Sequence, residues 1–394
     1  MNHPTSQSRP TRPPLWLAAS LVAVAWGALY DAGRWVVLFL NNPVHLDFRI
    51  FYVAAEAGLR YGWARIYDVE TLRALSSSFP FDESYINSSA TYINPPLLAW
   101  LIAPLTIVPL PIAYAVWTLV SLGALVWAWH ISAPYRGLAK FTLLLLALAL
   151  WPVMDSFYYG QPSILVLALV AATWWLCAKD RSLAAGAALA FATFLKPQVV
   201  ILVPLALLVS GRYRPFLAWA AGCVVLAGFS AAVLGQAGLA AWWQTLTYVQ
   251  GDAGHSYFTL AHLFGAGPLT YALEGLQGAV ALVIARRRRG DLNVVFALGL
   301  LGSLTFAFHL HQPDYSSLVL AAWLVLRTSP PLWHRLWLLA GIATMQAVTL
   351  GHPTPQLLWD STWLVILAVS SFFGSGASDP ATRPAASSGA RVGT

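Results

Sequence analysis

Long hydrophobic segments separated by short polar ones extend along almost the whole chain. A helix needs about 20 apolar residues to cross the roughly 30 Å hydrocarbon core of a bilayer, and most of these segments approach that length. We therefore predict an all-α polytopic membrane protein with about twelve transmembrane helices. The predicted spans are residues 15–40, 111–131, 138–154, 161–178, 182–195, 197–210, 214–234, 268–285, 292–309, 313–327, 332–350 and 356–374.

The apolar stretch 95–110 is predicted not to span the membrane. Five prolines interrupt or flank it: Pro95, Pro96, Pro104, Pro109 and Pro111. Because prolines break or kink helices, we interpret the stretch as a re-entrant or interfacial hairpin. This interpretation also keeps Arg136 and Lys140 on the same side of the membrane as most other basic residues.

Composition narrows the class of protein. Of the 394 residues 58% are hydrophobic and only 9% charged, against about 25% charged in ordinary soluble domains, which excludes a water-soluble globular protein. Cys177 and Cys223 both lie in apolar segments, so they predict neither a disulfide nor a cysteine metal site. The net charge is +7, but the basic residues are scattered between hydrophobic runs, and we expect no nucleic-acid partner.

The distribution of charge predicts the orientation. With the N-terminus in the cytoplasm, the predicted inner segments hold 16 of the 22 Lys and Arg residues, as the positive-inside rule requires. The cluster 286–289 lies on this side, where topology and anionic headgroups explain it. Residues 1–14 and 375–394 are rich in Pro, Ser, Arg and Gly, and we predict disordered cytoplasmic tails around one transmembrane domain at 15–374.

Two long segments, 41–94 and 235–267, are predicted as outer loops. Connections longer than about 12–15 residues are usually functional or disordered. These two contain aromatic and aliphatic residues throughout, so we expect them to fold against the membrane surface.

The first outer loop contains a predicted amphipathic helix with an acidic residue at its start. Phe48 and Phe51 begin an apolar pattern at helical spacing, with Arg49 and Glu56 between the apolar positions, which is typical of an interfacial helix. Asp47 immediately precedes this pattern. Its carboxylate could cap the helix, or it could act as a general base that faces a water-accessible cavity. The two roles are not exclusive.

A second candidate is the Lys196-Pro197 break between the short runs 182–195 and 197–210. Fourteen helical residues reach only about 21 Å, so the break is predicted at or below the outer interface. Lys196 could snorkel to the headgroups. Broken backbone and an ionisable group at membrane depth instead favour a wet, protein-lined cavity.

Polar side chains also gather at two other predicted outer junctions. They are Asp155, Tyr159 and Gln161 at the first, and His309, His311, Gln312 and Asp314 at the second. A His-x-His followed by Asp could ligate a divalent metal, but no further ligands follow at metal-site spacing, and we expect no metal. Hydrogen-bonding groups in a polar pocket, or a structural pair at a helix junction, are the alternatives.

Four motifs follow in order across roughly residues 15–330. They are Asp47-Phe48-Arg49-Ile50-Phe51-Tyr52-Val53-Ala54-Ala55 followed by Ile66-Tyr67-Asp68; Tyr92-Ile93-Asn94-Pro95-Pro96-Leu97 with Pro104-Leu105; Gly160-Gln161-Pro162-Ser163; and Leu195-Lys196-Pro197. Through these motifs the chain resembles glycosyltransferase family 87, membrane enzymes of the GT-C fold that use polyprenol-phosphate sugars and include bacterial α-mannosyltransferases. Ser163 departs from the Asn that family members often carry there, and no motif matches after residue 330.

The resemblance implies a GT-C-like fold in the plasma (inner) membrane, with an extracytoplasmic active site. It implies that a hexose, in particular mannose, is transferred from a polyprenyl-phosphate sugar to a lipid or glycan acceptor, with inversion at the anomeric carbon. Asp47 takes the place of the catalytic base, and Lys196, with His309 and His311 as auxiliary donors, faces the donor phosphate. Since the donor already carries a phosphate leaving group, no cofactor is expected. The residues expected to contact substrate are Tyr52, Asn94, Tyr159, Gln161 and Asp314.

Two other classes of function stay open on the sequence. A transporter or flippase for a lipid-linked or anionic substrate could use Lys196, Asp155 and Asp314 as pathway charges. The 54-residue outer loop and the lack of an internal repeat favour the transferase. A noncatalytic assembly partner in the envelope is the third class. A transferase requires Asp47 and Lys196 to share one cavity.

Overall fold

The structure is a computed structural model that describes residues 15–41, 46–79, 83, 86–87, 91–250 and 256–373. Within these residues it is all-helical and contains no strand. The principal helices are α1 (Leu15–Asn41), α2 (Leu46–Tyr61), η1 (Trp63–Arg65), α3 (Val69–Ser76), α5 (Pro96–Ile102), η2 (Ala103–Ile107), α6 (Leu110–Ser132), α7 (Gly137–Leu148), α8 (Trp151–Tyr159), α9 (Ser163–Ala178), α10 (Ser182–Leu195), α11 (Pro197–Val200), α12 (Leu202–Val209), α13 (Tyr213–Gln250), α14 (Ala261–Phe264), α15 (Pro268–Arg287), α16 (Leu292–Phe306), η4 (Gln312–Ser316), α17 (Ser317–Arg327), α18 (Leu332–Thr349) and α19 (Thr354–Phe373).

Helices long and apolar enough to cross a bilayer are fewer than the predicted spans. Among the described residues four qualify, α1, α6, α13 and α15, and the bent pair α7–α8 makes up to five. Several others, such as α10 with 14 residues, are apolar but short and reach about 21 Å. The chain is thus an all-helical protein with membrane-capable helices, and the count of twelve spans stays a prediction.

The predicted span 138–154 is broken rather than continuous. Helix α7 ends at Leu148, and α8 begins at Trp151 after a bend of 57°. Pro152 lies in the first turn of α8, a position where the missing N–H of proline costs nothing. The bend turns the end of α8 towards α2, which it contacts.

The second predicted outer loop, 235–267, is partly helical. Helix α13 continues to Gln250, past a kink at Gly235, where the backbone has φ 62° and ψ −176°. Glycine tolerates this conformation because it has no Cβ. The predicted outer segment therefore contains helix up to Gln250, and its place outside the membrane stays a prediction.

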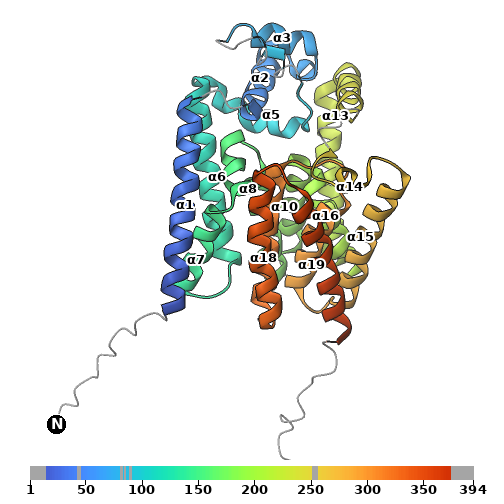
Figure 1. Cartoon of the computed structure of the whole chain (residues 1–394). Coiled ribbons are helices and arrows are strands. Elements are labelled where there is room, and N and C mark those ends of the chain that lie inside the picture. The colour runs from blue at the N-terminus through green and yellow to red at the C-terminus, as the bar shows by residue number, and fades with distance from the viewer. Residues whose placement is uncertain are drawn as a thin grey trace, which may run out of the picture.

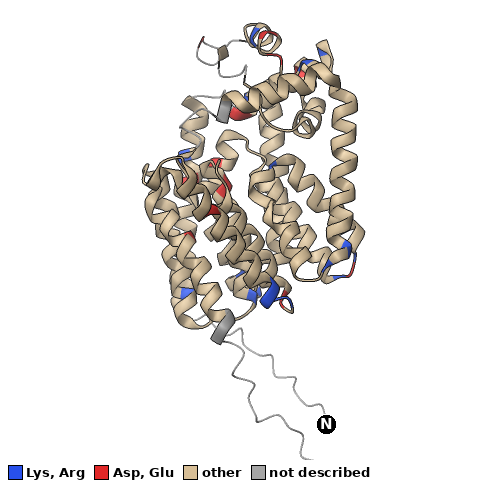
Figure 2. Ribbon diagram, turned by 90° about the vertical axis from the view of Figure 1, so that its right-hand side faces the viewer, with Lys and Arg blue, Asp and Glu red and all other residues tan. Residues whose placement is uncertain are grey.

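Figure 1 shows α2, α3 and α5 together at one end of the bundle, whereas α1 begins and α19 ends at the opposite end. Several Lys and Arg residues lie towards that opposite end, and a group of Asp and Glu residues lies in the other half (Figure 2). The predicted tails at 1–14 and 375–394 lie outside the described residues.

Helix α2 is buried more completely than an interfacial helix would be. Phe48 and Phe51 are buried as predicted, but Arg49 is also fully buried, at 0% exposure, and Glu56 at 8%. The prediction of a polar face at Arg49 is therefore wrong, because α5, η2, α6 and α8 all pack against α2. Only the last turn carries an exposed charge, at Arg60, which pairs with Glu56.

Candidate functional site

A cavity of about 630 Å³, here called the central cavity, opens near the end of the molecule that carries α2. Six separate stretches of the chain meet there: the start of α2, the segment before α5, α8 with the α8–α9 turn, the α10–α11 break, the segment before α14, and the segment from α16 to η4. Its polar lining side chains are Asp47, Thr91, Asn94, Asp155, Tyr159, Gln161, Lys196, Gln198, His309, His311 and Gln312.

The α8–α9 turn carries Gln161 into the cavity, and a glycine fixes its shape. Gly160 ends α8 with φ +66°, and a Cβ there would lie 2.6 Å from Cβ of Phe48 on α2. Both the left-handed conformation and the close approach require glycine. The indole N–H of Trp117 also donates to the Gly160 carbonyl at 2.8 Å. The turn is therefore held against the first turn of α2.

Asp47 lies in that first turn of α2, since the helix begins at Leu46. It is not at the N-cap position that the sequence suggested. Its Oδ2 accepts a hydrogen bond from Nε2 of Gln161 at 2.5 Å. The carboxylate is thus held by a side chain from another part of the chain and points into the central cavity.

Burial raises the pKa of the Asp47 carboxyl. The hydrogen bond from Gln161 and the positive charges of His311, Lys196 and Arg49 lower that pKa, without cancelling the effect of burial. A carboxylate whose pKa is moved towards neutral pH is a stronger base than a solvated one.

The ammonium group of Lys196 lies in the wall of the central cavity and has three acceptors around it. Its Nζ donates to Oε1 of Gln161 at 2.8 Å and to Oγ of Ser163 at 2.9 Å, and it pairs with Oδ1 of Asp314 at 2.5 Å. These three acceptors match the three N–H donors of an ammonium group. The predicted helix break at Lys196-Pro197 is present between α10 and α11, and the ammonium also orients Gln161.

Asp314 lies beneath Lys196 and outside the cavity lining. It is completely buried, and its Oδ2 accepts a hydrogen bond from the backbone N–H of His311 at 2.9 Å. One chain of polar contacts thus links Asp47, Gln161, Lys196 and Asp314. This geometry supports Asp314 as a positioning residue rather than as a group that touches substrate.

His309 and His311 line the central cavity with their rings edge to face, 4.9 Å between centroids. Asn94 and Tyr159 also line it, as predicted for substrate contacts. Tyr52 does not. Its hydroxyl donates to the carbonyls of η2 and the residue after it, Thr106 at 3.3 Å and Val108 at 2.9 Å, so it fastens α2 to that segment.

Four lining residues were not predicted from the sequence: Thr91, Gln198, Phe258 and Pro313. Gln198 directly follows Lys196-Pro197, and this position next to the predicted break could have identified it as a cavity residue. Asp155 was noted as polar, and it is a second carboxylate of the cavity with 3% exposure. Among the described residues its Oδ2 has no hydrogen-bond partner. No group of three or more His, Cys, Asp or Glu side chains in that part of the chain is arranged to hold a metal ion.

A second, largely apolar cavity of about 360 Å³ adjoins the central one, and we call it the apolar cavity. The two share Ile93, Asn94, Gln198 and His309. Side chains from α10, α11, α13 and the end of α16 form its other walls, among them Leu195, Ile201, Trp242, Leu246, Phe306 and Phe308. A charged group in the central cavity can therefore be joined to a hydrocarbon chain in the apolar one.

Comparison with known proteins places this site in a family. No curated protein and no solved structure is significantly similar to the chain. The profile described as glycosyltransferase family 87 matches residues 92–313, more than half of the chain, which include Asn94, Gln161, Lys196 and both cavity histidines. Asp47 lies before the matched region and is connected to it by its hydrogen bond with Gln161. The chain belongs to glycosyltransferase family 87 and is a membrane glycosyltransferase.

Proposed function

We propose that the protein transfers a hexose, in particular mannose, from a polyprenyl-phosphate sugar to a lipid or glycan acceptor on the extracytoplasmic face of the plasma (inner) membrane. The observation that carries this proposal is the junction of the two cavities. A polar cavity with carboxylate and cationic groups shares four lining residues with an adjoining apolar one. A sugar phosphate on a polyprenyl chain has the same two-part chemistry.

The donor must keep its chain in an apolar environment throughout the reaction. Each buried CH₂ withdrawn into water costs about 0.8 kcal/mol, so a polyprenyl chain cannot leave the bilayer to reach a solvated site. The apolar cavity offers such a chain a path beside Trp242 and Phe306 towards His309. A nucleotide sugar has no hydrocarbon chain that could occupy this apolar surface.

The proposed reaction is a single displacement. The acceptor hydroxyl attacks the anomeric carbon while the bond from that carbon to the phosphate oxygen breaks, and the hydroxyl proton passes to the Asp47 carboxylate. The electron pair of the broken bond leaves with the polyprenyl phosphate. His309 and His311 supply N–H donors, and Lys196 supplies positive charge, on the side where the phosphate charge grows.

This displacement inverts the anomeric centre. Retaining enzymes commonly use a second carboxylate as a nucleophile, whereas direct attack by the acceptor needs only one base. The hydrogen bond from Gln161 directs Asp47 into the cavity, which supports Asp47 as that base. Asp155 is the competing carboxylate.

The orientation rests on charge. Arg286, Arg287 and neighbouring basic residues lie at the end of α15, and basic residues are prominent in the half of the molecule away from α2 (Figure 2). The positive-inside rule assigns that half to the cytoplasm, which places the central cavity near the outer face. A Cys introduced at Ser77, next to α3, should react with an outside reagent, and one at Gly290 should not.

The test of the proposal is an assay with purified protein in lipid nanodiscs. A panel of polyprenyl-phosphate hexoses, including mannose and glucose, is incubated with membrane extract as the source of acceptor. We expect transfer from the mannose donor together with an equal amount of released polyprenyl phosphate. Release without transfer would indicate that the extract lacks the acceptor. Transfer from a nucleotide sugar, with none from any polyprenyl-phosphate donor, would contradict the proposal.

A further inference from the structure

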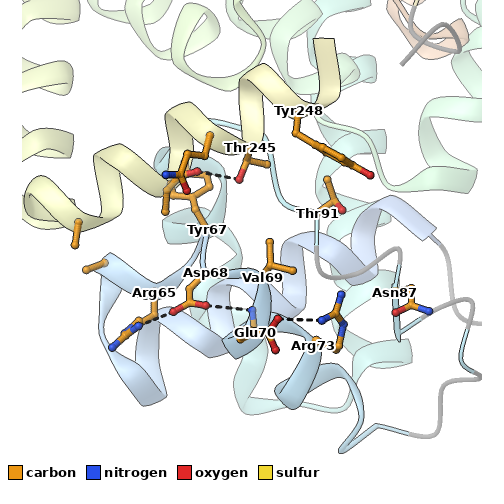
Figure 3. A pocket seen from close by; sticks show the side chains of 14 residues that line it. Arg65, Tyr67, Asp68, Val69, Glu70, Arg73, Asn87, Thr91, Thr245 and Tyr248 are labelled. Carbon is orange, nitrogen blue, oxygen red and sulfur yellow. Dashed lines mark hydrogen bonds and ion pairs between the residues drawn. The ribbon is translucent and has the colours of Figure 1, made fainter. Parts of the chain in front are cut away.

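A third cavity, about 920 Å³ in volume, lies beyond the central one and is here called the outer cavity. Its walls come from η1 and α3 on one side and from the last turns of α13 on the other, with Asn87 and Thr91 between them (Figure 3). Ligand sites usually measure about 300–1,000 Å³, so this cavity has room for more than one sugar ring. The proposed reaction takes place in the central cavity and does not involve this outer cavity.

The charges in the outer cavity cancel within pairs. Arg65 pairs with Asp68 at 2.5 Å, and Arg73 pairs with Glu70 at 3.1 Å, so its four ionised residues contribute no net charge. A cavity of this kind has no excess of either sign to attract a phosphate or an ammonium group. Its many donors and acceptors instead match a neutral ligand with hydroxyl groups, each of which both donates and accepts.

The α13 wall adds an aromatic side chain and amide groups. Tyr248 is exposed by 80% and extends towards the cavity (Figure 3). A tyrosine has an apolar ring face and a polar hydroxyl, and a sugar has a C–H face and a hydroxyl edge. Gln244, one turn earlier on α13, lines the same wall with an amide that donates and accepts.

One short segment separates the outer cavity from the central one. Thr91 lines both cavities. The hydroxyl of Tyr67, in the outer cavity, donates to the carbonyl of Asn94, in the central cavity, at 2.7 Å. Trp242 donates to the Ile93 carbonyl at 3.0 Å, and its ring stacks on Tyr67. The shared wall is therefore held from both sides, and Thr91 lies at the boundary of both cavities.

We propose that the outer cavity binds the non-reacting sugar units of the acceptor, so that the acceptor is an oligosaccharide or a glycolipid with several sugar units. The terminal unit passes Thr91 and presents its hydroxyl to Asp47, while the preceding units lie between α3 and α13. This inference rests on the proposed transferase function. It assigns the two substrates to opposite sides of the central cavity: the lipid donor to the apolar cavity, and the glycan acceptor to the outer cavity.

The test compares acceptors of different length on the full-length protein in nanodiscs. The probes are octyl glycosides with one to four hexose units and the same terminal unit. For the wild type, KM should fall as units are added. Tyr248→Ala and Gln244→Ala should each raise KM for the longer acceptors by roughly 3–10-fold, the size of one lost hydrogen-bonding or stacking contact, with kcat nearly unchanged. KM for the one-unit acceptor should not change.

Tyr213→Ala is the matched control, because Tyr213 is an exposed tyrosine, at 60%, at the opposite end of the same helix. It should leave every KM at the wild-type value. Equal KM values for all acceptor lengths, or a length dependence unaffected by both outer-cavity variants, would overturn the inference while transfer itself continues.

A binding measurement separates this inference from the proposed function. Saturation-transfer NMR with the four-unit glycoside reports contact without turnover. A weaker signal at the same glycoside concentration in Tyr248→Ala, but not in Tyr213→Ala, would support the outer cavity even if no donor in the panel reacts. If the wild type gives no signal while sugar transfer proceeds, the inference is wrong and the transferase proposal stands.

Discussion

The buried network beside the central cavity and the wall of the outer cavity contain similar charged side chains in opposite physical settings. Lys196 and Asp314 are 3% and 0% exposed, and they join parts of the chain that are far apart in sequence. Arg73 and Glu70 are 47% and 84% exposed and lie three residues apart on one helix. Water screens the second pair, and an exposed pair contributes about 0.2–1 kcal/mol.

A buried pair behaves differently, because each charge depends on the other for its solvation. Removing one partner of a buried pair usually costs about 3–5 kcal/mol. The comparison therefore predicts that single substitutions in the central network affect stability and turnover together. Substitutions in the outer cavity should affect acceptor use and little else.

The largest effect is expected for Lys196→Met. The variant leaves Asp314 buried without its cation and removes positive charge beside the departing phosphate. Transfer should fall by about 10²–10³-fold, and the thermal unfolding midpoint should fall as well. Both are measured on nanodisc samples by a transfer assay and by intrinsic fluorescence.

A second variant distinguishes charge from packing at this position. In Lys196→Met with Asp314→Asn, both charges are gone, and much of the lost stability should return while transfer stays low. Lys140→Met, at a lysine outside the central cavity whose Nζ donates to the His130 carbonyl, should leave transfer at the wild-type level. Recovery of transfer in the double variant would mean that the Lys196 charge has no part in catalysis.

The next effect concerns the turn that holds Gln161. Gly160→Ala places a Cβ in a left-handed conformation and against Phe48, whereas Gly211→Ala, at φ +83°, has no atom within 4 Å of the new Cβ. The conformational cost common to both is about 1–2 kcal/mol. Thermal unfolding should show a larger loss for Gly160→Ala, together with lower transfer. Equal losses would mean that the approach of α2 to this turn is not constrained.

A smaller effect is predicted for the pH dependence. In the proposed mechanism transfer requires the ionised form of Asp47, so we expect activity above the pKa of Asp47 and its loss as the pH falls through that pKa. Burial raises this pKa, and the hydrogen bond from Gln161 lowers it. Gln161→Leu should therefore shift the acid limb of kcat/KM to higher pH.

Gln198→Leu is the control for this shift, since Gln198 lines the same cavity and has no hydrogen bond to Asp47 among the side-chain contacts described above. It should change the rate without moving the acid limb. An acid limb at the same pH in Gln161→Leu and the wild type would mean that another group sets the profile.

The smallest effect is expected at the outer cavity. Arg73→Ala removes an exposed pair and should change the free energy of unfolding by at most about 1 kcal/mol. The measurement is the unfolding midpoint beside that of Lys196→Met. A loss of stability as large as that of Lys196→Met would contradict the distinction between the buried pair and the exposed pair.

Much of the fold could be predicted because many helices of the structure coincide with apolar stretches of the sequence. The prediction 182–195 matches α10, and the break at Lys196-Pro197 is present. The continuation of α13 past Gly235 was missed because two glycines and a glutamine, Gly235, Gln236 and Gly238, interrupt the apolar run and resemble the start of a loop. The bend before α8 was missed because the residues around it are as apolar as those of an unbroken span.

The site was predictable as a set of residues, but not as a network. Motif order brought Asp47, Gln161 and Lys196 into one hypothesis. The hydrogen bond from Gln161 to Asp47 joins residues 114 positions apart, and it depends on the contact of Gly160 with Phe48. Tertiary contacts of this kind leave no periodicity in the sequence. For the same reason Arg49 was predicted on a polar face, although it is completely buried.

The central claim is that Asp47, and not Asp155, removes the proton of the acceptor. The most direct measurement compares sugar transfer by Asp47→Asn, Asp155→Asn and Asp291→Asn under identical conditions. Asp291 caps α16 through the backbone N–H groups of Asn293 and Val294, and Asn caps a helix about as well as Asp, so this control should behave as wild type. We predict that Asp47→Asn keeps its fold and unfolding midpoint but loses transfer by about 10²–10⁴-fold, the range of general-base catalysis, and that Asp155→Asn loses less. Near-normal transfer by Asp47→Asn, with the large loss in Asp155→Asn, would contradict the account.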